Sequence, residues 1–456
     1  MDAASGLIAG KDAPAYLPAR PVFQNIQSGQ NVWPGTFQGI GLRLIPYFAE
    51  LGDAIEDAWR GAGGGLPRFP AIACRQLEHR PPFASVSVAT ILDWFFAARP
   101  SVEQSENASF GQPPIKLYQG SDFYIEALFW MTATTSIHQH GFAGAFTPLA
   151  GASVCSTFRY AVDRQVEPGF SLGTLERVHT EILRPGAVRP IHAGPGLIHQ
   201  LFHLDRPTVT IVVRTPADPQ SLPQLAYLPP GLAMDGLRDD PVVSRQLRLL
   251  GVMIDSGVAD VEAHAARILA QPAVAPAYRV LAYLVARAID SVMIDKLLAV
   301  FERAHPGLGA RLYQAACNQR RIALITQLRE TVSDPELRFF LALLMLLGDR
   351  EIIFQLIATE QPGCDPVERI ITWLHRLSGV DRVGIEFGDL ETAIFRALLR
   401  GCDVPAVLAS LTDEYEPDEI AHNHPALVDH ITRIASSEIF APLFCSSTSH
   451  VQSPSN

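Results

Sequence analysis

The chain has 456 residues, of which 48% are apolar, so it is long enough for two or three domains with cores of their own. Its formal net charge is −11, and no basic footprint for nucleic acid or anionic lipid is visible. The composition therefore argues against a nucleic-acid-binding protein and against attachment to a membrane through charge.

The cysteines and the first residues bear on the cellular compartment. Six cysteines are scattered without C-x-x-C spacing, which fits reduced thiols and does not predict a zinc finger. Residues 1–6 lack the basic region and apolar core of a secretory leader, and no apolar run has membrane-spanning length. We therefore expect a cytoplasmic protein without a membrane partner.

The first quarter of the chain is predicted to be helical. Residues 1–40 are rich in Gly, Pro and small polar residues, which predicts an irregular arm. Residues 41–112 are expected to form a helical segment that packs on the following domain. In this segment, apolar residues at three- and four-residue steps predict helices over Leu42–Arg60 and Val86–Ala98.

From residue 113 to 217 the pattern changes to short strands. Gly- and Pro-rich breaks separate these runs, which favours an antiparallel sandwich or small barrel. The predicted strands are Ile115–Tyr118, Phe123–Trp130, Thr147–Leu149, Ser153–Val162, Glu176–Leu183 and Thr208–Val213. The fold class is therefore α+β and multidomain: N-terminal helices, a β-barrel and a C-terminal helical part.

The second half of the chain is predicted to be all-α. Residues 218–240 are expected to be a Pro-rich connector, 241–442 an all-α domain and 443–456 a disordered tail. Ser333 or Asp334 can cap a helix with Pro335 in its first turn, and the apolar run Leu337–Leu347 predicts that this helix is central and buried. A protein partner or a second copy of the chain is expected to bind through this helical domain.

Three histidines form the most informative pattern. His138 and His140 are two residues apart in a predicted strand, so both side chains project from the same face. His199 follows a Gly/Pro turn, Gly194-Pro195-Gly196, and precedes another strand. Neutral imidazole is a suitable ligand for iron, zinc, copper and nickel, so the pattern predicts a three-histidine metal site.

These residues resemble the two motifs of the cupin superfamily. His138 and His140 fill its H-x-H, Gly151 fills the closing glycine of the first motif, and Gly196 with His199 fills the G-x-x-H of the second. Three positions depart from the pattern: Thr132 stands at the opening glycine, Gly144 or Ala145 at the glutamate, and His203 at the final asparagine. The resemblance implies a cupin-type barrel over Ile115–Ala217 with three histidines and no acidic ligand.

Among cupins, this ligand set and the string S-I-H-x-H resemble the thiol dioxygenases, such as cysteine dioxygenase. The resemblance implies a mononuclear Fe(II), O₂-dependent oxygenase, with nickel, copper and zinc as alternative metals. A third neutral ligand leaves the iron site more positive by one charge than two histidines and a carboxylate would, which favours an anionic small-molecule or carrier-bound substrate.

The residues expected to support catalysis depart from those of the thiol dioxygenases. Their S-x-H-x-Y strand corresponds here to Thr210, Val212 and Arg214, and the nearest match to their substrate-carboxylate arginine is Lys116. Arg214, Thr210 and Lys116 are therefore our candidate catalytic residues, and Arg214 is the candidate anion binder. Because the histidine and tyrosine of that strand are missing, we expect a substrate other than free cysteine.

Two further residues have alternative interpretations. Glu126 either faces outward from its strand, which we expect although the alternation does not decide it, or is a buried acid beside the metal. His203 is either a second-shell or structural residue or an alternative ligand. For the whole chain, one alternative is a non-catalytic metal- or ligand-binding cupin whose helical domain is an interaction platform. Another is a zinc or nickel cupin that catalyses hydrolysis or isomerisation.

Overall fold

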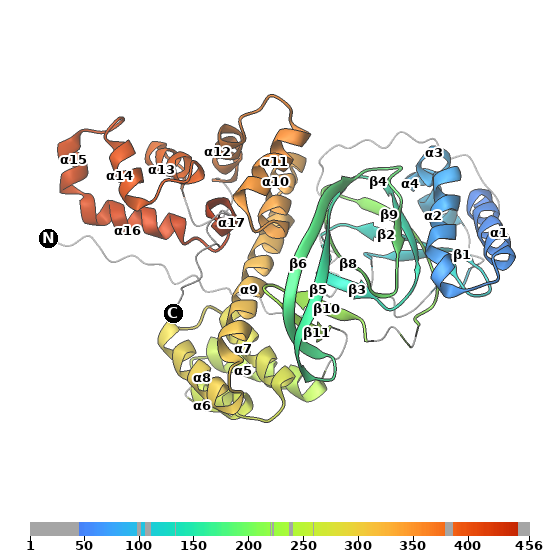
Figure 1. Ribbon diagram of the computed structural model, residues 1–456, viewed down its shortest axis with the longest axis horizontal. Coiled ribbons are helices and arrows are strands. Elements are labelled where there is room, and N and C mark those ends of the chain that lie inside the picture. Colours follow the sequence, from blue (N-terminus) through green and yellow to red (C-terminus); the bar gives the residue numbers. More distant parts are fainter. Residues whose placement is uncertain are drawn as a thin grey trace. The chain divides into compact units, whose positions relative to one another are not determined.

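The computed structural model describes residues 45–97, 102–104, 111–132, 134–218, 220, 223–236, 240–258, 260–378 and 386–445 (Figure 1). Most of the expected N-terminal arm and C-terminal tail lie outside these residues. The chain forms two compact units, divided after Leu237 and after Cys317. The domain limits expected from the sequence stay a prediction, because a compact unit is not necessarily a domain that folds independently.

One wall of the barrel is a five-stranded antiparallel sheet in the order β1-β2-β9-β4-β7. Its strands are β1 (Pro114–Gln119), β2 (Tyr124–Trp130), β9 (Thr208–Arg214), β4 (Gly144–Ala150) and β7 (Arg189–Ile191). Along β9, Val209, Ile211 and Val213 belong to the core on one face, whereas Thr210 and its alternating neighbours line a cavity on the other. The sheet therefore separates a helix-covered face from a cavity-lining face.

The other wall is formed by six strands that close on themselves in the order β10-β11-β6-β5-β8-β3. They are β10 (Leu225–Leu228), β11 (Leu232–Asp235), β6 (Phe170–Leu183), β5 (Ser153–Glu167), β8 (Gly194–His203) and β3 (Ile137–His140). Strand β10 closes the ring by pairing Ala226 with His138. Strands β10 and β11 lie within the range that we expected to be a connector, so the barrel extends beyond residue 217.

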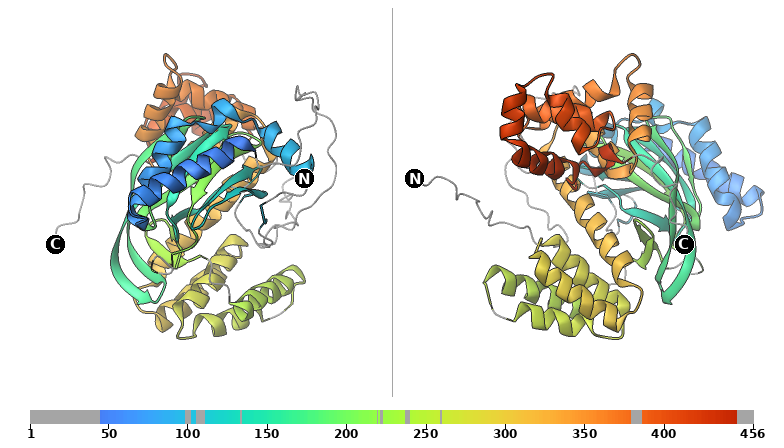
Figure 2. Two further views of the ribbon diagram at one scale, coloured as in Figure 1. Left: turned by 90° about the vertical axis from the view of Figure 1, so that its right-hand side faces the viewer. Right: turned by 60° about the vertical axis from the view of Figure 1, so that its left-hand side comes forward.

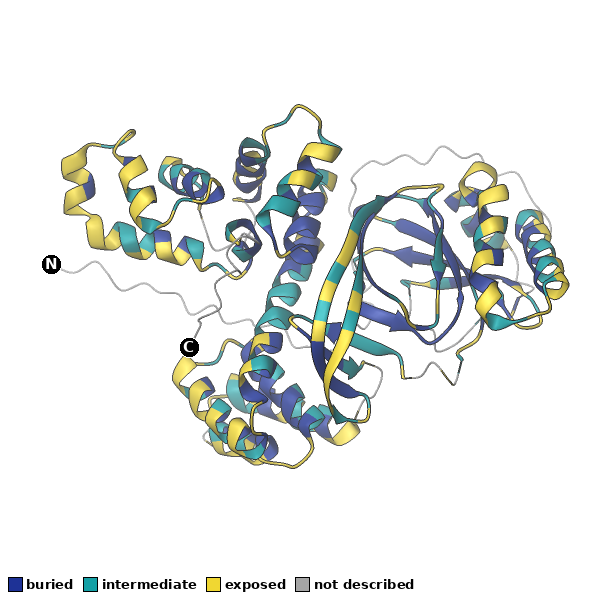
Figure 3. Ribbon diagram, viewed as in Figure 1, coloured by how far each residue is buried: buried dark blue, intermediate teal, exposed yellow. Residues whose placement is uncertain are grey.

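Figure 3 shows how burial differs between the walls: β2, β4 and β9 are buried along almost their whole length, whereas the middle parts of β5 and β6 are exposed. Four helices, α1 (Pro46–Gly61), α2 (Phe69–His79), α3 (Pro82–Ser85) and α4 (Val88–Ala97), precede the barrel. Apolar side chains of α1, α2 and α4 share a core with β1, β2 and β9. The helices cover the outer face of the five-stranded sheet (Figure 2, left).

The remaining helices follow the barrel in sequence. One compact unit contains α5 (Pro241–Asp255), α6 (Val261–Leu269), α7 (Val274–Ala286), α8 (Ser291–Ala304) and the start of α9 (Gly309–Thr331). The barrel unit contains the rest of α9, then α10 (Pro335–Leu346), α11 (Arg350–Glu360), α12 (Pro366–Leu377), α13 (Asp389–Leu399), α14 (Val404–Leu411), α15 (Pro417–His422), α16 (His424–Ala435) and α17 (Ala441–Phe444). Within the described ranges, no helix combines the length and apolar character needed to cross a membrane.

Helix α10 is the buried central helix expected from its apolar run. The Asp334 side chain caps it by accepting hydrogen bonds from the amides of Glu336 and Leu337. Residues Leu337 to Leu346 are all buried, and their core continues into Val154 and Phe202 on the barrel. The predicted architecture, an antiparallel β-barrel with N-terminal helices and a C-terminal helical part, is therefore confirmed.

A buried arginine joins these helices to the barrel. Nε and Nη2 of Arg329, in α9, donate to the His203 carbonyl at 3.2 and 2.6 Å, and Nη1 donates to the Thr132 carbonyl. Burial lowers the pKa of the Arg329 guanidinium to about 10, so the group is still charged at neutral pH. The charge is satisfied by main-chain carbonyls, which ties the end of β8 to α9.

We expect Arg329→Met to lower the free energy of unfolding by about 2 to 4 kcal/mol, because two buried carbonyls lose their donors. Arg329→Lys is the matched control. It keeps the charge and one donor group, so its free energy of unfolding should fall by less. Urea unfolding followed by circular dichroism measures both. A methionine variant as stable as the wild type would contradict the role assigned to this contact.

Candidate metal centre

The three predicted histidines come together inside the barrel. His138 and His140 lie on β3, and His138 is directly opposite His199 in the pairing with β8. Their exposed fractions are 4, 5 and 3%. The three candidate ligand atoms all lie within 4.8 Å of one another, and the Nε2 atoms of His140 and His199 are 3.0 Å apart. The strand register thus gathers three imidazoles at one buried point.

The surroundings keep these rings in the neutral, ligand-competent form. Burial lowers the pKa of His138, and burial together with the neighbouring charges lowers the pKa values of His140 and His199 well below the usual 6.5. Nδ1 of His138 donates to the Ser136 carbonyl at 2.8 Å, which fixes the proton on Nδ1 and leaves the Nε2 lone pair for a ligand bond.

One pair of ring nitrogens has the spacing expected for two ligands of one metal ion. Two imidazole nitrogens that are each about 2.1 Å from one ion, and at right angles to each other, are about 3 Å apart. The 3.0 Å separation of His140 and His199 matches that value. Among the described residues, the group of His, Cys, Asp and Glu side chains close enough to share an ion contains three histidines and no carboxylate. The chain can therefore hold a metal ion here; which ion is not defined by the geometry.

A cavity of about 40 Å³ adjoins the histidines. The surface of the cavity is mostly apolar, although seven of its fourteen lining side chains are polar. The lining residues are Glu126, Leu128, Trp130, Thr135, His138, His140, Phe142, Phe146, Ile191, His199, Leu201, Thr210, Val212 and Arg214. An apolar cavity with a few convergent polar groups is the usual form of a small-molecule site.

Two of the three candidate catalytic residues line this cavity. Thr210 and Arg214 face it from β9, and Arg214 Nη1 lies 3.3 Å from Glu126 Oε1. The Arg214 guanidinium also lies 3.7 Å from the centroid of the Phe142 ring. Nε of Arg214 is buried and has no hydrogen-bond partner among the described residues. Arg214 therefore keeps one donor for another group while Glu126 neutralises its charge.

Glu126 lines the cavity inside the barrel, contrary to the outward orientation that we expected. Its exposed fraction is 8%. Burial raises the pKa of its carboxyl group, and the Arg214 charge opposes that shift. Glu126 is not one of the side chains close enough to share an ion with the histidines. It belongs to the cavity wall, held by Arg214.

Lys116 and His203 lie outside the cavity wall. Lys116 Nζ donates to Gln119 Oε1 at 3.1 Å and lies 5.0 Å from the centroid of the Tyr124 ring. His203 Nδ1 is 2.8 Å from Ser153 Oγ, and its ring stacks on Trp130 at 4.5 Å. His203 therefore supports a residue of the cavity wall, and the expected catalytic role of Lys116 stays a prediction.

Several residues that line the cavity were missed by the sequence analysis. Trp130 and Thr135 are not among the residues that the sequence analysis assigned to a site. Because β2 is buried on both faces, its sequence has no signal that would separate Trp130 from its neighbours. Thr135 Oγ1 accepts a hydrogen bond from the amide of Leu201 at 2.7 Å, a contact between distant segments that no local pattern predicts.

Comparison with protein families and with curated proteins finds no match. Among solved structures, the chain is similar to hydroquinone 1,2-dioxygenase from Sphingomonas sp. TTNP3, with 12% identity over 24% of this chain and 69% of that chain and a TM-score of 0.19. It is similar to the DMSP lyase DddQ from Ruegeria pomeroyi DSS-3, with 16% identity over 40% of this chain and 96% of that chain and a TM-score of 0.22. It is also similar to an oxalate oxidase, with 14% identity over 37% of this chain and 83% of that chain and a TM-score of 0.19. At such TM-scores these activities are not transferred to this chain.

We expect His203→Asn to flatten the acid dependence of stability in the metal-free protein. Burial holds the pKa of His203 well below 6.5, so the unfolded chain takes up this proton and the folded chain does not. The contribution of neutral His203 is therefore present above about pH 6.5 and lost below it, by about 1 kcal/mol at pH 5.5. Urea unfolding of both proteins at pH 7 and 5.5 measures the difference. Equal losses in the two would contradict the expectation.

Proposed function

We propose that this chain is a mononuclear non-haem Fe(II), O₂-dependent oxygenase of the three-histidine cupin type. The supporting observation is the meeting of three buried, neutral imidazoles, without a carboxylate in their group, beside an apolar cavity that contains Arg214. The local motif resemblance to thiol dioxygenases agrees with this ligand set. The proposed substrate is small and anionic, and differs from free cysteine.

Charge supports the choice of substrate. Three neutral ligands leave the full charge of a divalent ion in a buried site, and the Glu126–Arg214 pair adds no net charge. An anionic donor such as a thiolate or carboxylate lowers the cost of that buried charge. In our proposal the substrate therefore enters as an anion, or becomes one by losing a proton inside the cavity.

The chain's own residues divide the work of binding. Arg214 orients the polar end of the substrate through its spare Nε donor, and Glu126 holds the guanidinium in place. The Glu126 carboxylate is also available to take a proton from a thiol or hydroxyl group, since burial raises its pKa. Trp130, Phe142 and Phe146 exclude water. An iron ion, when bound, would supply coordination positions and electrons for O₂ chemistry.

A second candidate function is a metal-binding cupin without turnover. The small size of the cavity favours it, because about 40 Å³ holds an ion's remaining ligands but little substrate. Phe142 packs on Arg214, and the Phe146 ring centroid is 5.7 Å from that of His199. For turnover, these aromatic side chains would have to move when the substrate enters.

Metal content tests the proposed ligand set. After anaerobic loading with Fe(II) and dialysis, elemental analysis should find about one iron per wild-type chain and almost none in His199→Ala, because two histidines bind iron weakly. Glu126→Gln should keep its iron. His179→Ala, which removes an exposed histidine from β6, is the matched control. Loss of iron in Glu126→Gln would show that this acid is a ligand and would overturn the three-histidine assignment.

Oxygen uptake by the iron-loaded chain tests the anion preference. We expect 3-mercaptopropionate to be oxidised faster than cysteamine, and Arg214→Gln to raise the KM for 3-mercaptopropionate about tenfold with a smaller effect on kcat. Lys296→Gln, which removes an exposed cation of α8, should leave both constants within about twofold. A fully iron-loaded protein that takes up no oxygen with either thiol would favour the non-catalytic candidate.

A further inference from the structure

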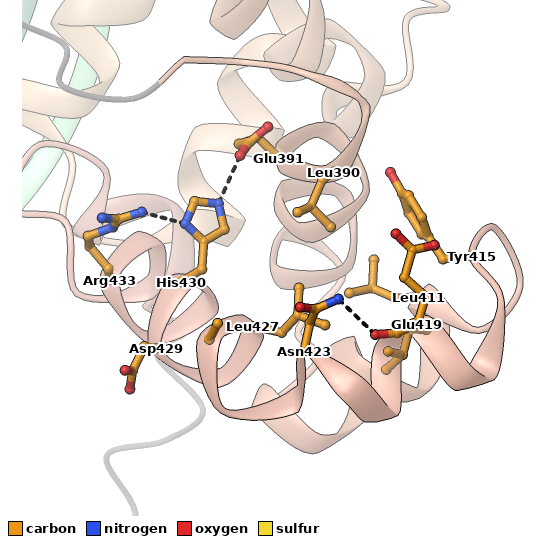
Figure 4. A pocket seen from close by; sticks show the side chains of 12 residues that line it. Leu390, Glu391, Leu411, Tyr415, Glu419, Asn423, Leu427, Asp429, His430 and Arg433 are labelled. Carbon is orange, nitrogen blue, oxygen red and sulfur yellow. Dashed lines mark hydrogen bonds and ion pairs between the residues drawn. The ribbon is translucent and has the colours of Figure 1, made fainter. Parts of the chain in front are cut away.

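A second pocket lies far from the barrel cavity in sequence, among four short helices near the end of the chain. Its volume is about 660 Å³, within the range of small-molecule sites. Side chains of α13, α14, α15 and α16 line it, together with Tyr415 from the turn between α14 and α15. Leu390, Leu411 and Leu427 form its apolar middle, and polar groups lie at both ends (Figure 4).

The polar groups at one end satisfy one another. His430 Nε2 donates to Glu391 Oε1 at 2.8 Å, and Arg433 Nη2 donates to His430 Nδ1. The second oxygen of Glu391 accepts a hydrogen bond from the amide of Gly388 at 3.0 Å. Figure 4 shows these three side chains as a chain along the pocket wall. The carboxylate at this end is satisfied, and the Arg433 charge disfavours a cation here.

The other end is open for a cation. Tyr415 and Glu419 lie there, and neither the phenol nor the carboxylate has a hydrogen-bond or ion-pair partner among the described residues. Burial and the carboxylates of Asp389 and Glu414 raise the pKa of the Tyr415 hydroxyl, which reports a negative potential at this point. A carboxylate beside an aromatic ring suits an ammonium group, through an ion pair and a cation–π contact.

The charge of the surrounding helices agrees with a cationic ligand. Residues 386–435 contain ten acidic residues and three arginines, a formal charge of −7 out of −11 for the whole chain. Such a field attracts cations and repels anions over about a Debye length. It also distinguishes this pocket from the barrel cavity, where we propose an anionic substrate.

The distribution of apolar surface favours a small molecule over a protein partner. Of the described large apolar side chains that are exposed, none lies in residues 386–445. A docking site for a helix or a second chain needs apolar contact beyond a single pocket. Here the apolar surface is confined to the pocket itself, which is the arrangement expected for a ligand that is taken up as a whole.

We infer that this pocket binds a small organic cation, with its ammonium group at Glu419 and Tyr415 and an apolar body against Leu390, Leu411 and Leu427. The inference is independent of the proposed oxygenase activity, because no residue of the barrel cavity takes part. It assigns to the helical part of the chain a ligand of its own.

Binding of phenethylamine to the full chain tests the inference, with 2-phenylethanol as its uncharged counterpart. By isothermal titration calorimetry, the amine should bind about tenfold more tightly than the alcohol. Raising the salt concentration from about 50 to 300 mM should weaken binding of the amine and leave binding of the alcohol unchanged. His199→Ala, which alters the barrel site, should bind the amine as the wild type does.

Three variants separate the pocket from the general acidity of these helices. Glu419→Gln should weaken amine binding about tenfold, and Glu416→Gln, which removes an equal charge outside the pocket, about twofold at most. Ala426→Trp fills the pocket from an exposed position on α16 without changing charge, and should abolish binding. Circular dichroism melting confirms that each variant is folded.

Two results would overturn the inference. One is equal binding of amine and alcohol, or equal effects of Glu419→Gln and Glu416→Gln, since the carboxylate would then not recognise the charge. The other is binding of a Lys-rich amphipathic peptide by a chain that does not bind phenethylamine, which would assign the pocket to a protein partner.

Discussion

The pairing of β3 with β8 is the constraint on which the candidate metal centre depends. His138 and His199 are opposite one another, and a slip of one residue would turn every imidazole of β3 to the other face. Gln139, between the two histidines of β3, anchors this strand on its other side. Its Oε1 accepts a hydrogen bond from the Tyr227 hydroxyl of β10, and its Nε2 donates to the Pro223 carbonyl at 3.2 Å. Gln139, which alternates with the two histidines, therefore holds β3 in place.

The two candidate sites of the chain follow opposite electrostatic designs. In the barrel, burial keeps the histidines neutral, and the one carboxylate of the cavity wall is neutralised by Arg214. The dielectric is low there, so a bound ion and its counter-charge interact strongly. Among the C-terminal helices, acidic groups are exposed and unbalanced, so attraction is weaker and depends on salt. The barrel site is suited to chemistry in a cavity shielded from water. The pocket among the C-terminal helices is suited to reversible binding.

Much of the site could be predicted because its signals are local. The H-x-H spacing in β3, the Gly-rich turn before His199 and the alternation of β9 each lie within one strand. The orientation of Glu126 could not be predicted: β2 is buried on both faces, so alternation of polar and apolar residues has no information there. The prolines around Tyr227 concealed β10 and β11, which are only four residues long. The cation pocket has no motif, because it exists only once four short helices have packed.

The shared core of the barrel and the C-terminal helices has a practical consequence. The apolar residues Val154 and Phe202 on the barrel's outer surface pack into the same core as α10, and Arg329 satisfies the carbonyl of His203. The strand that completes the ring, β10, follows residue 217 in sequence. A fragment limited to residues 115–217 would therefore lack the strand that pairs with β3 at His138. It would also expose the apolar surface around Val154 and Phe202 to water. Aggregation of such a fragment would say nothing about the competence of the intact site.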